Sequence, residues 1–192
     1  AGADMLGFIF YPPSPRYITP EDARAITDGL RAQLKGRCPA LIGVFVNQTA
    51  DATDRILRRA GLDYAQLSGD ESADVLKALG GRGFKALRAY DTEQAVADTM
   101  YYLPYLPRDK RVPALLVDAY HKDLYGGTGE KVNVEVAQAI LRLTPRLMLA
   151  GGLTPDNVAG RIRAVRPWGV DVASGVEGVT PGRKDAACVL AF

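Results

Sequence analysis

The chain of 192 residues is poor in the side chains that metal, redox and nucleophilic sites use: it has two cysteines and one histidine. Cys38 and Cys188 lie far apart in the sequence and match no metal-binding or redox spacing. We therefore expect two ordinary thiols in a reducing compartment. His121 lies alone in the polar stretch 120–123, and we assign it no function.

Long apolar runs and a strong excess of one charge are also missing. No run approaches the roughly 18 to 20 apolar residues that a membrane-spanning helix needs, and residues 1–4 lack the basic start of a signal peptide. The formal net charge is only +2, with scattered basic residues, which argues against nucleic-acid binding. We expect a cytoplasmic protein that binds neither membranes nor nucleic acids.

What the chain does have is a regular alternation of short apolar runs and amphipathic segments. With 47% apolar residues it can bury one substantial core, so we expect a single domain over residues 1–192. Seven apolar runs are typical of buried parallel strands, at 5–10, 41–46, 64–67, 84–87, 114–117, 146–149 and 169–172. Helices are predicted between them, at 20–35, 52–60, 72–79, 92–103, 132–143, 155–165 and 182–190.

Two glycine-rich turns follow the last two predicted strands: one contains Gly151 and Gly152, the other Ser174 and Gly175. Glycine lets the backbone approach a ligand closely, and the start of a helix leaves N–H groups unpaired. Two such turns on adjacent parallel strands would hold a phosphate, as they do after strands 7 and 8 of a (β/α)₈ barrel. We therefore expect an α/β fold, a TIM barrel lacking its first β/α unit, with a doubly wound open sheet as the alternative.

Several motifs together resemble the phosphoribosylanthranilate isomerase family of tryptophan biosynthesis. The resemblance covers the whole chain in the family's order. The most specific motifs are Pro13-Ser-Pro-Arg-Tyr17 and Gly126-Gly-Thr-Gly129, and the others are Gly43-Val-Phe-Val-Asn47, Gln66-Leu-Ser-Gly-Asp-Glu71, Leu116-Val-Asp-Ala-Tyr120, Ala150-Gly-Gly-Leu-Thr-Pro-Asp-Asn157 and Asp171-Val-Ala-Ser-Gly-Val-Glu-Gly178.

The resemblance implies an Amadori rearrangement of N-(5-phosphoribosyl)anthranilate by general acid and base, without a cofactor. It implies that Asp118 is the general acid and that Arg16 binds the anthranilate carboxylate, which suits a planar guanidinium. From the residues alone, Asp118 could equally cap a loop, and Arg16 could be an ordinary surface residue. The remaining implied contacts are Gly127 and Gly129 for the substrate, and Gly151, Gly152, Ser174 and Gly175 for its phosphate. Asp171 is a candidate orienting residue, and we expect a monomer or a homodimer.

Two departures from the family pattern stand out. The family's general base is a cysteine in a Lys-Ile-Cys-Gly-Leu type motif, which this chain does not contain, so we expect the chain to be inactive by itself. Ser68 stands where the family usually has histidine. Two alternatives therefore stay open: a non-catalytic phosphate-binding remnant of a barrel, and a histidine-pathway aminoaldose isomerase that works with two aspartates.

Overall fold

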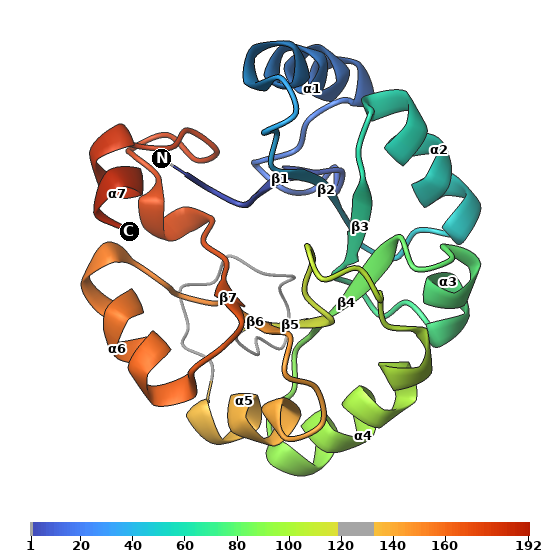
Figure 1. Cartoon of the computed structure of the whole chain (residues 1–192), viewed down its shortest axis with the longest axis vertical. Helices are drawn as coiled ribbons and strands as arrows, with labels where there is room; N and C mark the ends of the chain where they lie inside the picture. The colour runs from blue at the N-terminus through green and yellow to red at the C-terminus, as the bar shows by residue number, and fades with distance from the viewer. Residues whose placement is uncertain (1, 119–132) are drawn as a thin grey trace.

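The computed structural model describes residues 2–118 and 133–192, which contain one parallel sheet of seven strands in the order β1-β2-β3-β4-β5-β6-β7. Figure 1 shows the strands around the centre of the molecule and the helices outside them. The strands are β1 (Met5–Ile9), β2 (Ala40–Phe45), β3 (Tyr64–Leu67), β4 (Gly83–Leu87), β5 (Leu115–Val117), β6 (Leu147–Leu149) and β7 (Gly169–Val170). The helices are α1 (Pro20–Leu34), α2 (Ala50–Ala60), α3 (Ala73–Ala78), α4 (Thr92–Tyr102), α5 (Val134–Leu141), α6 (Pro155–Val165) and α7 (Ala186–Ala191), with short 3₁₀ turns η1 (Leu103–Tyr105) and η2 (Ser174–Val176).

Local signals in the sequence fix where several helices begin. The Thr19 hydroxyl accepts a hydrogen bond from the backbone N–H of Asp22 at 3.1 Å, and Pro20 occupies the first helical position of α1. The Asp91 carboxylate caps α4 by accepting from the N–H of Gln94 at 2.8 Å. These side chains satisfy donors that a helix start leaves unpaired.

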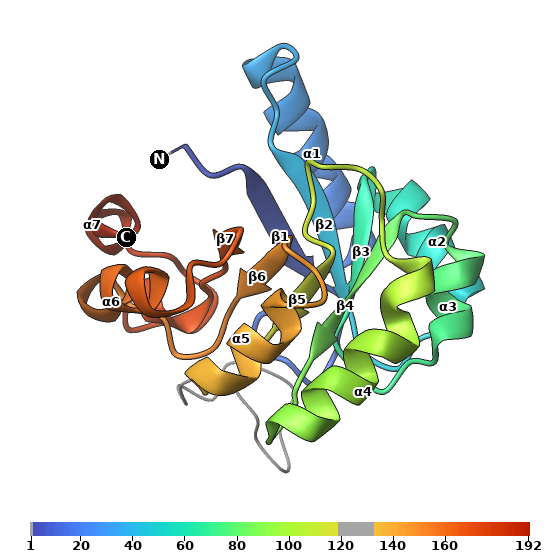
Figure 2. The same ribbon diagram turned by 60° about the horizontal axis from the view of Figure 1, so that its bottom comes forward.

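The two faces of the sheet bury different sets of side chains. One face packs against residues from the helices, such as Leu57 of α2 and Ile140 of α5, in the larger apolar cluster. The other face holds a smaller cluster with no helical member, which includes Phe84, Leu116 and Met148. Because side chains alternate along a strand, burial on both faces requires nearly continuous apolar strands. Figure 2 shows the strands side by side with the helices against one face of the sheet.

The predicted α/β fold with seven parallel strands is confirmed, and the sheet is open among the described residues. β1 pairs with β2 and β7 pairs with β6, but no hydrogen-bonded ladder joins β1 to β7 within residues 2–118 and 133–192. Figure 1 places β1 and β7 at the two ends of the row of strands. Within these ranges neither outer edge pairs with a further strand, and only the isolated bridge of Ile9 with Tyr17 covers part of the β1 edge.

The last predicted helix, 182–190, was placed too early. Gly182 has a φ of +85° and lies in a turn, and α7 starts at Ala186, where the Asp185 carboxylate accepts from the N–H of Cys188 at 2.9 Å. The segment before α7 instead folds back on the loop that follows β7, and Lys184 forms an antiparallel bridge with Glu177 of that loop. This turn brings Lys184 beside residues that follow β7.

Candidate active site

The carboxyl ends of parallel strands share one edge of a sheet, and Asp118 lies at that edge directly after β5. Its backbone N–H donates to the carbonyl of Leu87 at the end of β4 at 2.9 Å. The preceding carbonyl, of Val117, accepts from the N–H of Ala150 at 2.9 Å. The Asp118 side chain is partly exposed. These bonds hold Asp118 one strand away from the first glycine turn, at the edge where barrel enzymes carry their catalytic groups.

The first glycine turn needs its glycines for backbone conformation. Gly151 and Gly152 have φ values of +86° and +60°, in the left-handed region that favours glycine. Asn157 braces the turn: its Oδ1 accepts from the N–H of Thr154 at 3.0 Å, and its Nδ2 donates to the carbonyl of Gly152 at 2.8 Å. Helix α6 begins at Pro155, so the positive end of its dipole lies beside this turn.

The second glycine turn packs directly on the first. A Cβ atom on Gly175 would lie 1.7 Å from the carbonyl oxygen of Leu153, so no larger residue fits there. Ser174 and Gly175 begin the 3₁₀ turn η2, which follows β7. The two turns predicted to hold a phosphate therefore lie side by side, at the ends of the adjacent strands β6 and β7.

Arg16 is engaged in an ion pair across the open side of the sheet. Its Nε and Nη2 donate to Oε1 and Oε2 of Glu177, both at 2.7 Å. The Glu177 side chain is 6% exposed and also accepts from Nζ of Lys184 at 3.0 Å. The hydrogen bond from Arg16, followed by the one from Lys184, lowers the pKa of Glu177 to about 2 against the cost of burial. The pair joins the loop after β1 to the loop after β7.

Asp171 and Ser68 also lie at the carboxyl edge. The N–H of Asp171 donates to the carbonyl of Leu149 at 2.9 Å, and burial raises the pKa of its carboxyl while the charge of Lys184 opposes that rise. The Ser68 hydroxyl accepts from Nε2 of Gln66 at 3.1 Å. A hydroxyl cannot carry the positive charge of a protonated histidine, so Ser68 contributes only hydrogen bonding at this position.

Some of the predicted site residues lie outside the described residues, namely Gly127 and Gly129, together with His121. Within the described ranges, no three His, Cys, Asp or Glu side chains are grouped so that they could hold a metal ion. No helix in the same ranges is long and apolar enough to cross a membrane.

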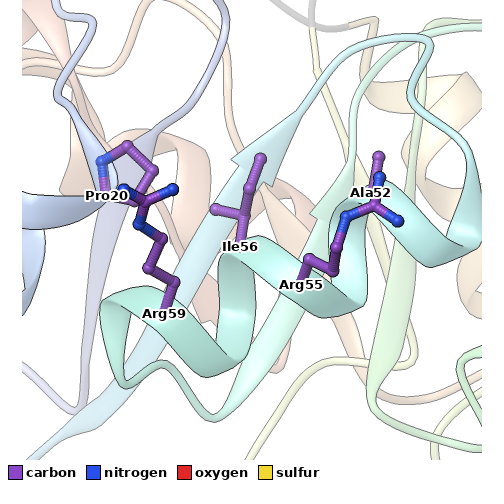
Figure 3. Close-up of a pocket in the computed structure, with 5 residues that line it drawn as sticks. All are labelled: Pro20, Ala52, Arg55, Ile56 and Arg59. Carbon is purple, nitrogen blue, oxygen red and sulfur yellow. The ribbon is translucent and has the colours of Figure 1, made fainter.

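A shallow pocket of about 380 Å³ lies elsewhere, between α1 and α2 in the outer layer of helices (Figure 3). It is lined by Pro20, Ala52, Arg55, Ile56 and Arg59. Its only charged lining residues are Arg55 and Arg59, and Arg59 is paired with Glu21. The pocket includes none of the predicted site residues, so we assign it no part in the reaction.

Comparison with known proteins bears on one of the two open alternatives. A family model described as N-(5'phosphoribosyl)anthranilate (PRA) isomerase matches residues 1–192. The chain belongs to the phosphoribosylanthranilate isomerase family. An N-(5'-phosphoribosyl)anthranilate isomerase of Trichlorobacter lovleyi is 42% identical over 192 residues, which are 100% of this chain and 86% of the relative. One of Roseiflexus castenholzii is 47% identical over 197 residues, covering 100% of this chain and 87% of the relative.

Solved structures of phosphoribosylanthranilate isomerases share the fold. The enzyme of Thermus thermophilus aligns with a TM-score of 0.79 at 33% identity, over 99% of this chain and 86% of that one. A phosphoribosylanthranilate isomerase in complex with reduced 1-(o-carboxyphenylamino)-1-deoxyribulose 5-phosphate aligns with a TM-score of 0.74 at 32% identity, over 100% of this chain and 86% of that one. The histidine-pathway alternative is thereby set aside.

Two features of this family member were missed by sequence reasoning. Glu177 and Lys184 were not assigned to Arg16, because nothing local to either residue indicates a partner in a loop after β1. The buried pair of Lys85 and Glu71 was also missed, although a lysine inside the apolar run 84–87 was a signal that could have revealed it. A charge in a buried strand needs a partner, so Lys85 by itself implied a carboxylate close by.

Proposed function

We propose that this protein isomerises N-(5'-phosphoribosyl)anthranilate to 1-(2-carboxyphenylamino)-1-deoxyribulose 5-phosphate, a step of tryptophan biosynthesis, with the residues of the carboxyl edge as its active site. The observation that supports the residue assignment is the contact of Gly175 with Leu153, which brings two glycine turns together at the edge of the sheet that also carries Asp118. The family membership of the whole chain supports the reaction itself.

The phosphate of the substrate would bind to the paired turns. Backbone N–H groups of Gly151, Gly152, Ser174 and Gly175 are the donors, with the N-terminus of α6 adding a partial positive charge. This assignment makes the close fit of Gly175 a requirement for binding, since a shifted turn would misplace its donors.

Substitution of Gly175 tests the phosphate site. Gly175→Ala would force its turn away from the Leu153 carbonyl, and we expect the affinity for inorganic phosphate to fall about tenfold. Gly178→Ala is the matched control, because a Cβ there meets nothing within 4 Å. Isothermal titration calorimetry measures both. Equal phosphate affinity of Gly175→Ala and wild type would remove the turns from the site.

Asp118 and Arg16 would act on different parts of the substrate, the ribose ring and the anthranilate ring. Asp118 protonates the ring oxygen of the ribose, which opens the ring to a Schiff base. A base then removes the proton from C2′ to give an enolamine, which tautomerises to the ketone. Arg16 binds the carboxylate of the anthranilate ring, and Gly127 and Gly129 would contact the substrate from the segment outside the described residues.

The general base would come from a further strand between β1 and β7. The unpaired edges of these two strands support this proposal, because one more β/α unit would pair with both and close a TIM barrel. In the family, the cysteine base follows such a strand. The protein would function as a monomer or a homodimer; a phosphoribosylanthranilate isomerase of Thermotoga maritima, 33% identical with a TM-score of 0.76, is described as dimeric.

Restoring that strand tests the function. We expect the 192-residue chain by itself to bind the reduced product analogue without turnover, because it lacks the base. Fused behind a β/α unit that carries the family's cysteine motif, it should consume N-(5'-phosphoribosyl)anthranilate, followed by substrate fluorescence. A fusion with serine in place of that cysteine is the control and should be inactive. A folded, inactive cysteine fusion would favour the non-catalytic phosphate-binding remnant.

A further inference from the structure

We propose that Glu177 is a positioning residue for carboxylate recognition. It binds Nε and Nη2 of Arg16, so that the guanidinium presents Nη1 to the substrate. The inference deepens the proposed function and rests on it, since Arg16 is the assigned carboxylate ligand.

The geometry of the pair leaves one edge of Arg16 for a ligand. Nε and Nη2 of Arg16 donate to the two carboxylate oxygens of Glu177 at 2.7 Å each, so the carboxylate lies along one side of the guanidinium. Within residues 2–118 and 133–192, no hydrogen bond or ion pair involves Nη1 of Arg16. The Arg16 side chain is 18% exposed, so it is not sealed from the carboxyl edge of the sheet. A substrate carboxylate would therefore meet Nη1.

Fixing the arginine in advance reduces the cost of binding. A free arginine side chain loses rotamer freedom when it grips a ligand, and that loss weakens the complex. The bidentate pair with the nearly buried Glu177 has already fixed the plane of the guanidinium. The backbone contributes as well, because the N–H of Arg16 donates to the Ser14 hydroxyl at 3.2 Å.

The charges of the cluster leave room for one more anion. Arg16 and Lys184 are two cations around the single carboxylate of Glu177. Burial raises the pKa of Asp171, whose carboxyl also interacts with Lys184, and the charge of Lys184 opposes that rise. The three residues Arg16, Lys184 and Glu177 together carry one excess positive charge, which a substrate carboxylate would neutralise.

Lys184 also connects the cluster to the second glycine turn. Its Nζ donates to the carbonyl of Ala173 at 2.6 Å, directly before Ser174. The backbone of Glu177 is held separately, because its N–H donates to the carbonyl of Ser174 at 3.0 Å. Loss of the Glu177 charge should therefore release the Arg16 side chain while the backbone of the phosphate turn keeps its own bond.

A double-mutant cycle with two ligands tests the proposal. The carboxylate probe is reduced 1-(o-carboxyphenylamino)-1-deoxyribulose 5-phosphate, and ribose 5-phosphate is the probe without a carboxylate. Glu177→Gln should weaken binding of the carboxylate probe about tenfold and that of ribose 5-phosphate by less than about twofold. In an Arg16→Ala background, Glu177→Gln should change neither affinity further, because the residue acts through Arg16. Calorimetry on the 192-residue chain measures all four proteins.

Controls separate positioning from a general loss of structure. Glu93→Gln, an exposed glutamate in the first turn of α4, should bind both probes as wild type does. Glu177→Asp keeps the charge with a shorter reach and should fall between wild type and Glu177→Gln. Equal weakening of both probes by Glu177→Gln, or an undiminished effect in the Arg16→Ala background, would overturn the positioning role.

The same measurements distinguish the positioning role of Glu177 from the assignment of Arg16 as the carboxylate ligand. A wild-type protein that binds the carboxylate probe no better than ribose 5-phosphate would overturn the assignment of Arg16, and the role of Glu177 with it. A wild type that prefers the carboxylate probe, together with a Glu177→Gln variant that keeps this preference, would overturn the role of Glu177 alone.

Discussion

Asp118→Asn is expected to lower kcat of the barrel closed by its cysteine-bearing unit by about 10²- to 10⁴-fold, the usual contribution of a positioned general acid. Asparagine keeps the size of Asp118 and its backbone bond to Leu87 at the end of β4. It has no acidic proton for the ring oxygen, so ring opening should become the slow step. Substrate fluorescence gives kcat and KM for both proteins.

Two comparisons make this result specific to the acid. Binding of the reduced product analogue should change by less than about threefold, because that ligand is already past the step that needs the acid. Asp74→Asn, at an exposed carboxyl in the first turn of α3, should leave kcat unchanged. If Asp118→Asn retained wild-type kcat, another group would have to be the acid.

Lys85→Met should lower the free energy of unfolding by about 3 to 5 kcal/mol, because it leaves a buried carboxylate without its cation. Lys85 and Glu71 are 4% and 1% exposed in their side chains, and Nζ lies 3.3 Å from Oε2. Burial lowers the pKa of Lys85, and the charge of Glu71 opposes that shift. Methionine has a similar length but carries no charge, so no cation would offset the free energy of burying the Glu71 carboxylate.

The ion pair also ties together loops at the carboxyl edge. Nζ of Lys85 donates to the carbonyls of Leu67 at 3.0 Å and Gly69 at 2.6 Å. Oε1 of Glu71 accepts from the N–H of Asn47 at 2.8 Å and of Gly69 at 3.2 Å. Loss of the lysine should therefore loosen the loops after β2 and β3 together.

Chemical denaturation measures the effect, with two reference proteins. Lys77→Met removes an exposed lysine of α3 and should change stability by less than about 0.5 kcal/mol. The double variant Glu71→Gln/Lys85→Met should be more stable than Lys85→Met, because it no longer buries an unpaired charge. A Lys85→Met protein as stable as wild type would show that the pair does not stabilise the fold.

Local sequence patterns predicted most of the helices and strands of this protein. The run 64–67 and the helix 155–165 were predicted with the bounds that the structure has, and the caps of α1 and α4 at Thr19 and Asp91 are local as well. Each of these features depends on residues within one turn or one strand. The start of α7 was misplaced, because the segment before it is held by Glu177, which a local reading does not see.

The sequence by itself determined the alternation of strands and helices, the positions of the glycine turns and, through its motifs, the family. Only the tertiary structure decided that Gly175 packs on Leu153, that Arg16 pairs with Glu177 and that Lys85 is buried beside Glu71. The physical reason is the range of the forces involved. Periodicity, capping and glycine conformation act over a few residues, whereas close packing and buried ion pairs form only when the sheet brings distant loops together.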